Sequence, residues 1–506
     1  MKTVLALDQG TTGSTALVIG QDGSVLGRGY REFAQHFPRP GWVEHDPDEI
    51  FRVTVEVGRE AIAKAGVSPP PVAIGITNQR ETVVVWDRAS GAPLHRALVW
   101  QDRRTAERCR ELKSELAADY IANRTGLTWD PYFSATKIEW LMQNDGDVRS
   151  KIAAGEALVG TVDTWLVWKL TGGEAFVTDH SNASRTMLYN IRSRVWDAEL
   201  LQLFGVPLEC LAEIRESSGV VGSALSQHFG SEIPIAGIAG DQQAALYGQG
   251  CWEPGRAKCT YGTGAFLLFP ISGALEIHTA ETGLLTTVAC AADGSPVYAV
   301  EGSVFIAGAA IQWLRDGLGL IASASEAEAI ASSVASSDGV YFVPAFVGLG
   351  APHWESEARG TIVGLTRGTT RVHLIRAGLE AMAYSIRELL DAVTGSVGLE
   401  LAELRVDGGA AANDWLMQFQ ADTLDVLVSR PDVVETTALG AAGLAGLATG
   451  VWENAEQFMQ GRSYTTFSPG SGNTIDYAGW LRAVSSALHW ARNPDTASLQ
   501  ETKTLS

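Results

Sequence analysis

The chain has 506 residues, 46% of them hydrophobic and 19% charged, which predicts a globular protein of several domains and excludes a largely disordered one. The formal net charge of −20 excludes nonspecific binding to nucleic acid, because no basic surplus exists to neutralise phosphates. A nucleotide ligand is compatible with this charge, since backbone N–H groups and a divalent cation can hold polyphosphate.

The cysteines and the apolar runs indicate in which cellular compartment the protein works. Five scattered cysteines without a CxxC pair predict reduced thiols rather than disulfides or a zinc site. We expect no signal peptide, because the first three residues lead directly into an apolar strand, and the longest apolar run, residues 439–447, is short and rich in Ala and Gly. We therefore expect a soluble, cytoplasmic protein with no integral membrane segment.

Strands and helices alternate along the first part of the chain, which favours an α/β architecture. Asp46 followed by Pro47 predicts the start of an amphipathic helix. The predicted elements are strand–turn–strand at 3–19, a strand at 24–33, a helix at 46–64 and strands at 72–77 and 82–87, followed much later by a long amphipathic helix at 372–393.

The pattern restarts near the middle of the chain. Residues 235–241 predict a strand that runs into a polar loop, and residues 242–250 predict a helix. Residues 257–269 then repeat the strand, glycine turn and strand of the N-terminus. We infer two similar α/β domains, residues 1–248 and 249–506, with a nucleotide bridging the cleft between them.

The first glycine-rich turn runs from Asp8 to Gly13. Gly10 and Gly13 permit tight backbone geometry, and Thr11 and Thr12 offer hydroxyl and amide donors to phosphate. Asp8 could hold Mg²⁺, which keeps much of its hydration shell in proteins. No Lys follows and the next element is a strand, so this is not the strand–GxxxxGK[ST]–helix loop. The alternative is a simple hairpin turn.

Two further turns resemble the first. Tyr261-Gly262-Thr263-Gly264 offers a second grip on phosphate, and Gly408-Gly409, after another predicted strand, would let an adenine or ribose lie flat on the backbone. Each one alone is equally compatible with an ordinary turn. Three such turns in one two-domain chain favour a nucleotide site.

Asp241 is the candidate for acceptor chemistry. It follows a predicted strand at the domain boundary, where its carboxylate could accept the proton of an attacking hydroxyl, as a kinase requires. The competing interpretation is an N-cap for the helix that begins at Gln242.

Other candidates for substrate contacts lie on or near turns. Arg80 and Glu81 form an adjacent pair whose donors and acceptors suit a polyol, unless they are a solvated surface pair. Trp100, Tyr132 and Phe266 could enclose the carbon chain of a small substrate, although an aromatic residue more often belongs to the core.

Together these segments resemble the FGGY carbohydrate kinase family, and most closely its glycerol-phosphorylating members, from about residue 3 to about residue 455. The resemblance implies the actin-like, hexokinase-like (ribonuclease H-like) ATPase fold, in which two duplicated α/β domains surround a central cleft. It rests on long runs that include LDQGTTGS, PGWVEHDP, GITNQRET, VWQDRRTAE, GTVDTWLVWKLT, NASRTMLYNI, IAGIAGDQQAALYGQ, VPAFVGLGAPHW, VDGGAAAN and TALGAAGLAGLA.

The resemblance also implies a reaction, the in-line transfer of the γ-phosphoryl group of ATP to glycerol with Asp241 as general base, and a role for each matching residue. The residues it places at glycerol are Arg80, Glu81, Trp100, Tyr132, Asp241, Gln242 and Phe266. Those it places at the nucleotide are Thr11, Thr12, Gly13, Thr263, Gly308, Gln312, Gly409 and Asn413, with Asp8 at Mg²⁺.

Two departures from this pattern bear on ligand binding or control. Thr15 stands where many glycerol-phosphorylating members have Arg, which predicts weaker binding of phosphate without a change of reaction. Residues 227–234 lack the Gly-rich, Arg-containing loop that some members use for inhibition by fructose 1,6-bisphosphate. They are more similar to members controlled by a phosphotransferase-system regulator, with His228 as the candidate site; the alternative is an exposed loop histidine.

Two other functions stay open at this point. One is a related kinase for another polyol or a ketose, and the other is a non-catalytic nucleotide-binding sensor. The presence of both Asp8 and Asp241 argues against the sensor. The family commonly forms dimers and tetramers, so we expect a homodimer or homotetramer.

Overall fold

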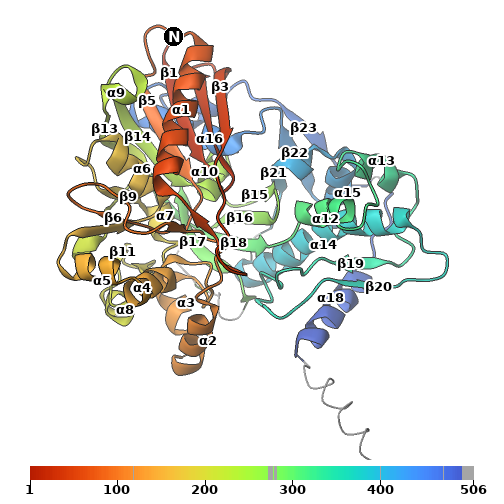
Figure 1. Cartoon of the computed structure of the whole chain (residues 1–506). Helices are drawn as coiled ribbons and strands as arrows, with labels where there is room; N and C mark the ends of the chain where they lie inside the picture. The colour runs from red at the N-terminus through yellow and green to blue at the C-terminus, as the bar shows by residue number, and fades with distance from the viewer. Residues whose placement is uncertain (118, 272–276, 278–281, 399, 471, 493–506) are drawn as a thin grey trace, which may run out of the picture.

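The computed structural model describes residues 1–117, 119–271, 277, 282–398, 400–470 and 472–492, which form two α/β lobes (Figure 1). The first lobe is built on a six-stranded mixed sheet of order β13-β14-β5-β1-β2-β3. Its strands are β1 (Thr3–Gln9), β2 (Gly13–Gly20), β3 (Val25–Glu32), β5 (Ala73–Asn78), β13 (Ser218–Ala224) and β14 (Ile233–Gly240).

The second lobe repeats this sheet. Its seven-stranded order is β17-β18-β16-β15-β21-β22-β23, in which an antiparallel meander β15-β16-β18 continues into parallel β21 and β22, as the meander β1-β2-β3 continues into β5 and β14. The predicted duplication is therefore confirmed. The strands are β15 (Arg256–Tyr261), β16 (Ala265–Ile271), β17 (Leu285–Cys290), β18 (Pro296–Val304), β21 (Glu403–Asp407), β22 (Leu427–Pro431) and β23 (Tyr464–Phe467).

Helix α1 (Pro47–Ala65) covers one face of the first sheet. Its predicted cap is confirmed, because the Asp46 side chain accepts the backbone N–H groups of Asp48 and Glu49. The helix lies directly on β3, where a Cβ at Gly27 would stand 2.1 Å from the Ala61 carbonyl oxygen. Helix α6 (Val162–Leu170) packs on the same hydrophobic core.

Two helices separate the sheets. Helix α16 (Thr436–Ala448), from the C-terminal part of the chain, packs against β1, β5 and β14 of the first lobe. Helix α10 (Asp241–Gly248) lies between α16 and the second sheet. The helices cross at glycines: a Cβ at Gly440 would stand 1.8 Å from the Ala244 carbonyl oxygen, and one at Gly248 would stand 2.1 Å from that of Thr436. The first lobe is thus completed by a helix that follows most of the second lobe in the sequence.

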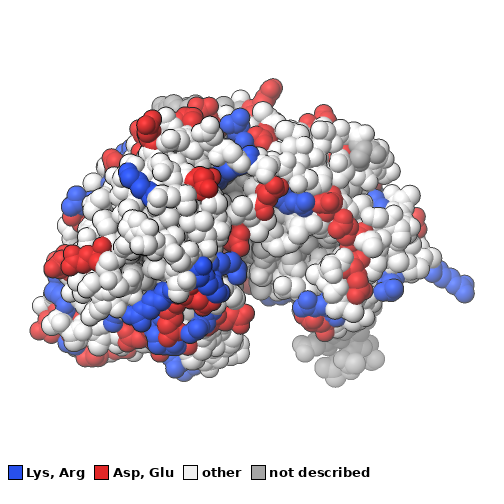
Figure 2. Space-filling view, turned by 90° about the horizontal axis from the view of Figure 1, so that it is seen from above, with Lys and Arg blue, Asp and Glu red and all other residues white. Residues whose placement is uncertain are grey.

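Helices α12 (Gly308–Asp316), α14 (Arg371–Val397) and α15 (Asp414–Leu424) pack on the main core of the second lobe. The long helix predicted at 372–393 is confirmed as α14. Seen from above, the molecule is hollowed between its two lobes (Figure 2). Among the described residues, no helix has both the length and the apolar character to cross a membrane.

Short elements complete the lobes. In the first part of the chain they are β4 (Glu44–His45), β6 (Val84–Asp87), β7 (Ala97–Leu98), α2 (Ala106–Glu115), α3 (Tyr120–Thr125), α4 (Ser134–Asn144), α5 (Gly146–Ala153), β8 (Ala157–Gly160), β9 (Val177–Asp179), α7 (His180–Ala183), β10 (Tyr189–Asn190), β11 (Val195–Trp196), α8 (Ala198–Phe204), η1 (Leu208–Cys210), β12 (Glu213–Arg215) and α9 (Ser226–Phe229). In the second they are α13 (Glu326–Ser332), β19 (Tyr341–Val343), β20 (Thr361–Val363), η2 (Gly409–Ala412), α17 (Ala455–Met459) and α18 (Tyr477–Arg492).

Candidate active site

Arg80 and Glu81 lie on the turn after β5 and are buried, with 2% and 1% of their surfaces exposed. They are therefore not a solvated surface pair. Glu81 adopts a left-handed backbone conformation with φ of 63°, which costs energy for a residue with a side chain. Strained, buried charges of this kind persist only where their surroundings hold them in place.

The guanidinium of Arg80 joins both lobes. Its Nη1 and Nη2 donate to the two carboxylate oxygens of Glu301, on β18, at 2.6 and 3.1 Å. Nη2 also lies 3.2 Å from the hydroxyl of Tyr132, and Nε lies 3.2 Å from Oδ1 of Asp241. A planar guanidinium with this many partners has a fixed orientation.

Arg185 and Glu301, which were not among the predicted site residues, complete this network. Arg185 donates from Nε to Glu81 at 2.7 Å and from Nη2 to Glu301 at 2.9 Å. Burial alone would raise the pKa of Glu301, but Arg185 and Arg80 outweigh it and hold that pKa at about 2. For Glu81 burial prevails over Arg80 and Arg185, and its pKa is raised.

A charged residue inside an apolar strand is the signal that could have revealed Glu301. It stands in the run YAVEGSV, and a buried carboxylate requires a cationic partner. Arg185 lies within the run NASRTMLYNI, which the resemblance includes without giving the arginine a role. The partners themselves come from distant parts of the chain.

Asp241 is the first residue of α10, and Gly240 is the N-cap, so Asp241 does not have the capping role that we weighed against catalysis. Its Oδ1 accepts the N–H of Gln242 at 2.7 Å. With 30% of its side chain exposed, it is more accessible than the buried Arg80 beside it. Gln242 is held by Lys258 of the second lobe, whose Nζ lies 2.5 Å from Oε1.

Three aromatic rings lie next to these charges. The Trp100 ring meets those of Tyr132 and Phe266 edge-on, with centroids 5.5 and 6.3 Å away. Trp100 also donates from Nε1 to the Thr11 hydroxyl at 2.9 Å, which links the acceptor residues to the first glycine turn. Tyr132 is buried, whereas Trp100 and Phe266 are partly exposed.

The first glycine turn is closed by a bond of 3.0 Å from the Gly10 N–H to the Gly13 carbonyl. Burial, and then the negative charges of Asp241 and Glu435, raise the pKa of Asp8 to about 7. Nothing in the described chain forms a salt bridge with Asp8. A half-buried carboxylate beside like charges is a suitable ligand for Mg²⁺.

A cation held there would not be enclosed by protein. In the part of the chain that the structure describes, no group of three or more His, Cys, Asp or Glu side chains could hold a metal ion. Mg²⁺ usually takes one or two carboxylates from the protein and completes its shell with water and substrate phosphates.

The second glycine turn is fastened to the start of α12. The Thr263 carbonyl accepts the N–H groups of Ala307 and Ala309, and the Gly308 N–H donates to Gly262 at 3.0 Å. A Cβ at Gly308 would stand 2.5 Å from the Gly262 carbonyl oxygen, so only glycine fits. The first N–H groups of α12 are used in these bonds, so a phosphate at this turn would be bound by the hydroxyl and backbone N–H of Thr263 itself.

The third turn follows β21 beside the second. Gly408 has φ of 87°, and a Cβ there would stand 2.5 Å from the Tyr261 carbonyl oxygen. Gly409 is exposed in η2, and Gln312 is exposed one turn into α12. Asn413 is the N-cap of α15, where its Oδ1 accepts the Leu416 N–H at 2.8 Å. No described residue accepts a hydrogen bond from the side-chain amide of Asn413, so its N–H groups can serve a ligand.

His228 lies away from these residues, in α9. Only 8% of its surface is exposed, its ring packs edge-on against Phe51 at 5.5 Å, and its carbonyl accepts Arg59 Nε at 2.6 Å. Burial and Arg59 lower the pKa of the imidazole. The alternative of an exposed loop histidine is therefore wrong.

Two repeated α/β lobes with glycine turns, and a buried polar site beside the first turn, suit a kinase for a small polar substrate. The N-terminal domain of the FGGY family of carbohydrate kinases matches residues 3–248, and its C-terminal domain matches residues 257–449. The chain belongs to this family.

Several proteins that are similar to this chain over nearly its whole length are named glycerol kinase. The chain is 54% identical to the glycerol kinase of Carboxydothermus hydrogenoformans over 499 residues, covering 97% of this chain and 99% of that protein. It is 52% identical to glycerol kinase 2 of Thermotoga maritima, with 97% and 100% covered. The crystal structure of Plasmodium falciparum glycerol kinase with ADP matches with a TM-score of 0.88 at 37% identity, with 96% and 98% covered.

Proposed function

We propose that the protein transfers the γ-phosphoryl group of ATP to glycerol, giving sn-glycerol 3-phosphate and ADP, in glycerol catabolism. The observation that carries the proposal is the convergence of Arg80, Glu81, Tyr132, Trp100 and Asp241 on one site beside the first glycine turn. The proposal is supported by sequence identity: more than half of the aligned residues are identical to those of proteins named glycerol kinase, over nearly their whole length.

The charges fit a small triol. Glu81 accepts a hydrogen bond from Arg185 at one carboxylate oxygen, and its other oxygen can accept a hydrogen bond from a substrate hydroxyl. Arg80, fixed by Glu301, presents its edge toward Asp241. Trp100 and Phe266 would pack on the carbon chain, and Gln242 would contribute its amide. The hydroxyls of glycerol would then be paired with charged groups and its carbons with rings.

Asp241 is the proposed general base. In the transfer, the attacking hydroxyl oxygen forms a bond to the γ-phosphorus, its proton passes to the Asp241 carboxylate, and the bond from the γ-phosphorus to the bridging oxygen of ADP breaks. The partly exposed carboxylate beside Arg80 suits this role, because it is accessible and oriented.

The nucleotide would lie across the three glycine turns. Thr11, Thr12 and Gly13 would hold phosphates from the first lobe, and Thr263 and Gly308 from the second. Gln312, Gly409 and Asn413 would lie at the nucleoside. Asp8 would bind Mg²⁺, which neutralises charge on the phosphates when bound.

Other parts of the proposal concern setting and control. We expect a cytoplasmic homodimer or homotetramer. His228 stays a proposed site of control by a phosphotransferase-system regulator, and because its ring is buried, phosphorylation would require α9 to move. A kinase for another polyol or ketose, or a nucleotide-binding sensor, are the alternatives.

Release of ADP with glycerol, xylulose, ribulose and erythritol as acceptors distinguishes these functions. We expect turnover with glycerol at a kcat/KM well above that of the other three. A higher value for a ketose would favour a related sugar kinase, and no turnover with any acceptor would favour the sensor.

Asp241→Asn tests the general base. The amide keeps the size of the side chain and cannot accept the hydroxyl proton, so kcat should fall by about 10²–10⁴-fold while ADP still binds. Near-normal turnover would contradict the assignment. The matched control is Asp338→Asn, the same substitution at an exposed position of the second lobe, which should leave turnover unchanged.

A further inference from the structure

The phosphate side of the cleft is rich in negative charge. Asp8 and Asp241 lie there, and Glu435, directly before α16, is close enough to Asp8 to raise its pKa. A polyphosphate adds more negative charge to the same place. Backbone N–H groups and one Mg²⁺ can hold polyphosphate, and a basic side chain beside the first glycine turn would add a direct charged contact.

Two basic groups near Asp241 already have partners. Arg80 is bound to Glu301 and Tyr132, and Lys258 is buried with its Nζ on Gln242. Both are enclosed, and neither projects from the strands that carry the first glycine turn. A basic side chain that contacts the phosphates on that side would therefore be a different one.

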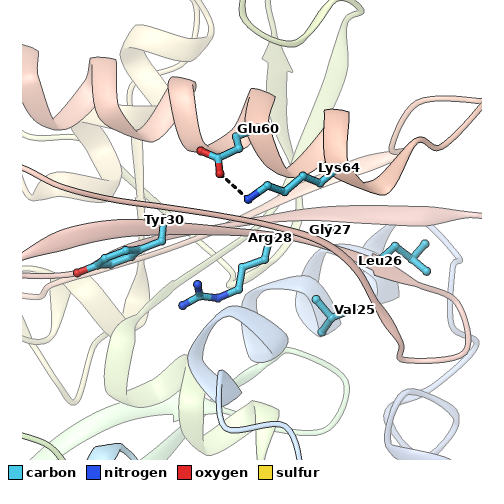
Figure 3. Close-up of a pocket in the computed structure, with 7 residues that line it drawn as sticks. All are labelled: Val25, Leu26, Gly27, Arg28, Tyr30, Glu60 and Lys64. Carbon is cyan, nitrogen blue, oxygen red and sulfur yellow. Dashed lines mark hydrogen bonds and ion pairs between the residues drawn. The ribbon is translucent and has the colours of Figure 1, made fainter.

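Arg28 on β3 projects from the sheet face that carries Asp8. In the register of the sheet, Asp8 pairs with Thr15 and Thr15 pairs with Tyr30, so these three side chains share a face. Arg28 is two residues from Tyr30 on the same strand, so its side chain lies on this face as well. Figure 3 shows Arg28 extending in the direction of Tyr30 and away from Glu60 and Lys64 of α1.

Contacts connect Arg28 to the glycine turn. Its guanidinium lies 5.7 Å from the centre of the Tyr30 ring, and a Cβ at Gly13 would stand 3.1 Å from that ring. Arg28 Nε lies 3.3 Å from a carboxylate oxygen of Glu435. The arginine therefore lies one aromatic ring away from the turn and beside a carboxylate that approaches Asp8.

Thr15 stands between Asp8 and Tyr30 and carries no charge. A short side chain at this position leaves room above β2 for a longer one from the neighbouring strand. The side chains of Arg28 and Glu435 are 52% and 31% exposed, so their ion pair is weak and can be exchanged for a stronger one. Phosphate oxygens offer such an exchange, because a guanidinium binds them in a bidentate manner.

We propose that Arg28 is a phosphate-binding residue of the nucleotide site, held beside the glycine turn by Glu435 and Tyr30 until the nucleotide binds. Arg28 provides a positive charge from β3, at a place where Thr15 of the neighbouring strand β2 is uncharged. The inference rests on the proposed function, since it assumes that a nucleotide occupies this turn.

Arg28→Ala, with ADP and Mg²⁺ as the probe, tests the inference by calorimetry. We expect the Kd of ADP and the KM of ATP to rise at least about tenfold, as for the loss of one charge-assisted hydrogen bond, while the KM of glycerol stays within about twofold. Arg31→Ala is the matched control, because Arg31 is equally exposed on the same strand but is paired with Glu56 of α1. Adding Thr15→Arg to Arg28→Ala should restore binding.

Equal ADP binding by Arg28→Ala and the unsubstituted protein would overturn the inference, as would an equal loss in Arg31→Ala. Thermal unfolding of each variant shows whether it is folded, and Arg28→Lys, which keeps the charge without the bidentate geometry, should have intermediate affinity. If the unsubstituted protein binds no ADP, the proposed function itself fails. If it binds ADP and Arg28→Ala is unchanged, only the role of Arg28 fails.

Discussion

Replacing Glu301 with Gln should disturb the acceptor site although Glu301 need not touch the substrate. Its carboxylate is fully buried, holds Arg80 through two hydrogen bonds and holds Arg185 through a third. The amide keeps one acceptor oxygen and introduces an NH₂ group beside two guanidinium groups. Arg80 would then lose part of the contact that fixes its orientation toward Asp241.

The size of the effect follows from burial. Removing one partner of a buried ion pair costs about 3–5 kcal/mol, because the other charge is left uncompensated. We expect about 3 kcal/mol here, since Gln retains one acceptor and Arg80 keeps Tyr132 and Asp241. The pair also joins the lobes, so a looser Arg80 should raise the KM of glycerol by about tenfold or more and the KM of ATP much less.

Steady-state kinetics with each substrate varied, together with urea unfolding, measure both effects. The control is Glu380→Gln, because Glu380 is 4% exposed and pairs with Arg376 at 2.7 Å within α14 of the second lobe. This variant should lose stability and keep the KM of glycerol. If Glu301→Gln keeps that KM as well, the network does not orient Arg80 and our reasoning is refuted.

Two further substitutions test the helix crossing and Asp8. Gly440→Ala places a Cβ where the Ala244 carbonyl lies and should destabilise the protein by about 2 kcal/mol, measured by urea unfolding, whereas Gly395→Ala in α14 meets nothing within 4 Å and should be neutral or stabilising. Folding raises the pKa of Asp8 from 3.8 to about 7. Between these pH values the native state holds a proton that the unfolded state has released. The contribution of this carboxyl to the free energy of unfolding therefore falls as the pH rises. Asp8→Asn should therefore gain more thermal stability at about pH 8 than at about pH 5 and lose Mg²⁺-dependent turnover; an equal shift at both values would contradict the raised pKa.

Local sequence signals predicted much of the fold. The first hairpin, the capped helix α1 and the amphipathic helix α14 were predicted because glycine turns, N-caps and hydrophobic periodicity act within a few residues. The repeated strand–turn–strand pattern predicted the duplication of the sheets. Contacts between distant segments were not predictable in this way: nothing in the sequence of α16 indicates that it covers the sheet of the first lobe.

The same distinction applies to the site. Arg80, Glu81 and Asp241 stand on turns where strands end, and the resemblance to the family gave them roles. Glu301 and Arg185 lie 116 residues apart, and their bond is visible only in the folded chain. Sequence reasoning also left open whether Arg80 and Glu81 are exposed, because the charges that compensate their burial come from these two residues.

The position of α16 in the sequence affects the order in which the protein can assemble during synthesis. The sheet of the first lobe is made from residues 3–240, yet the face of it that carries Val4, Ala6 and Leu17 is covered by residues 436–448. A ribosome releases that helix only after nearly the whole second lobe. Until then an apolar sheet face stays open to water and to other nascent chains, so the N-terminal half cannot mature as an independent unit. Truncation before α16 should therefore yield an aggregating fragment rather than a free first lobe.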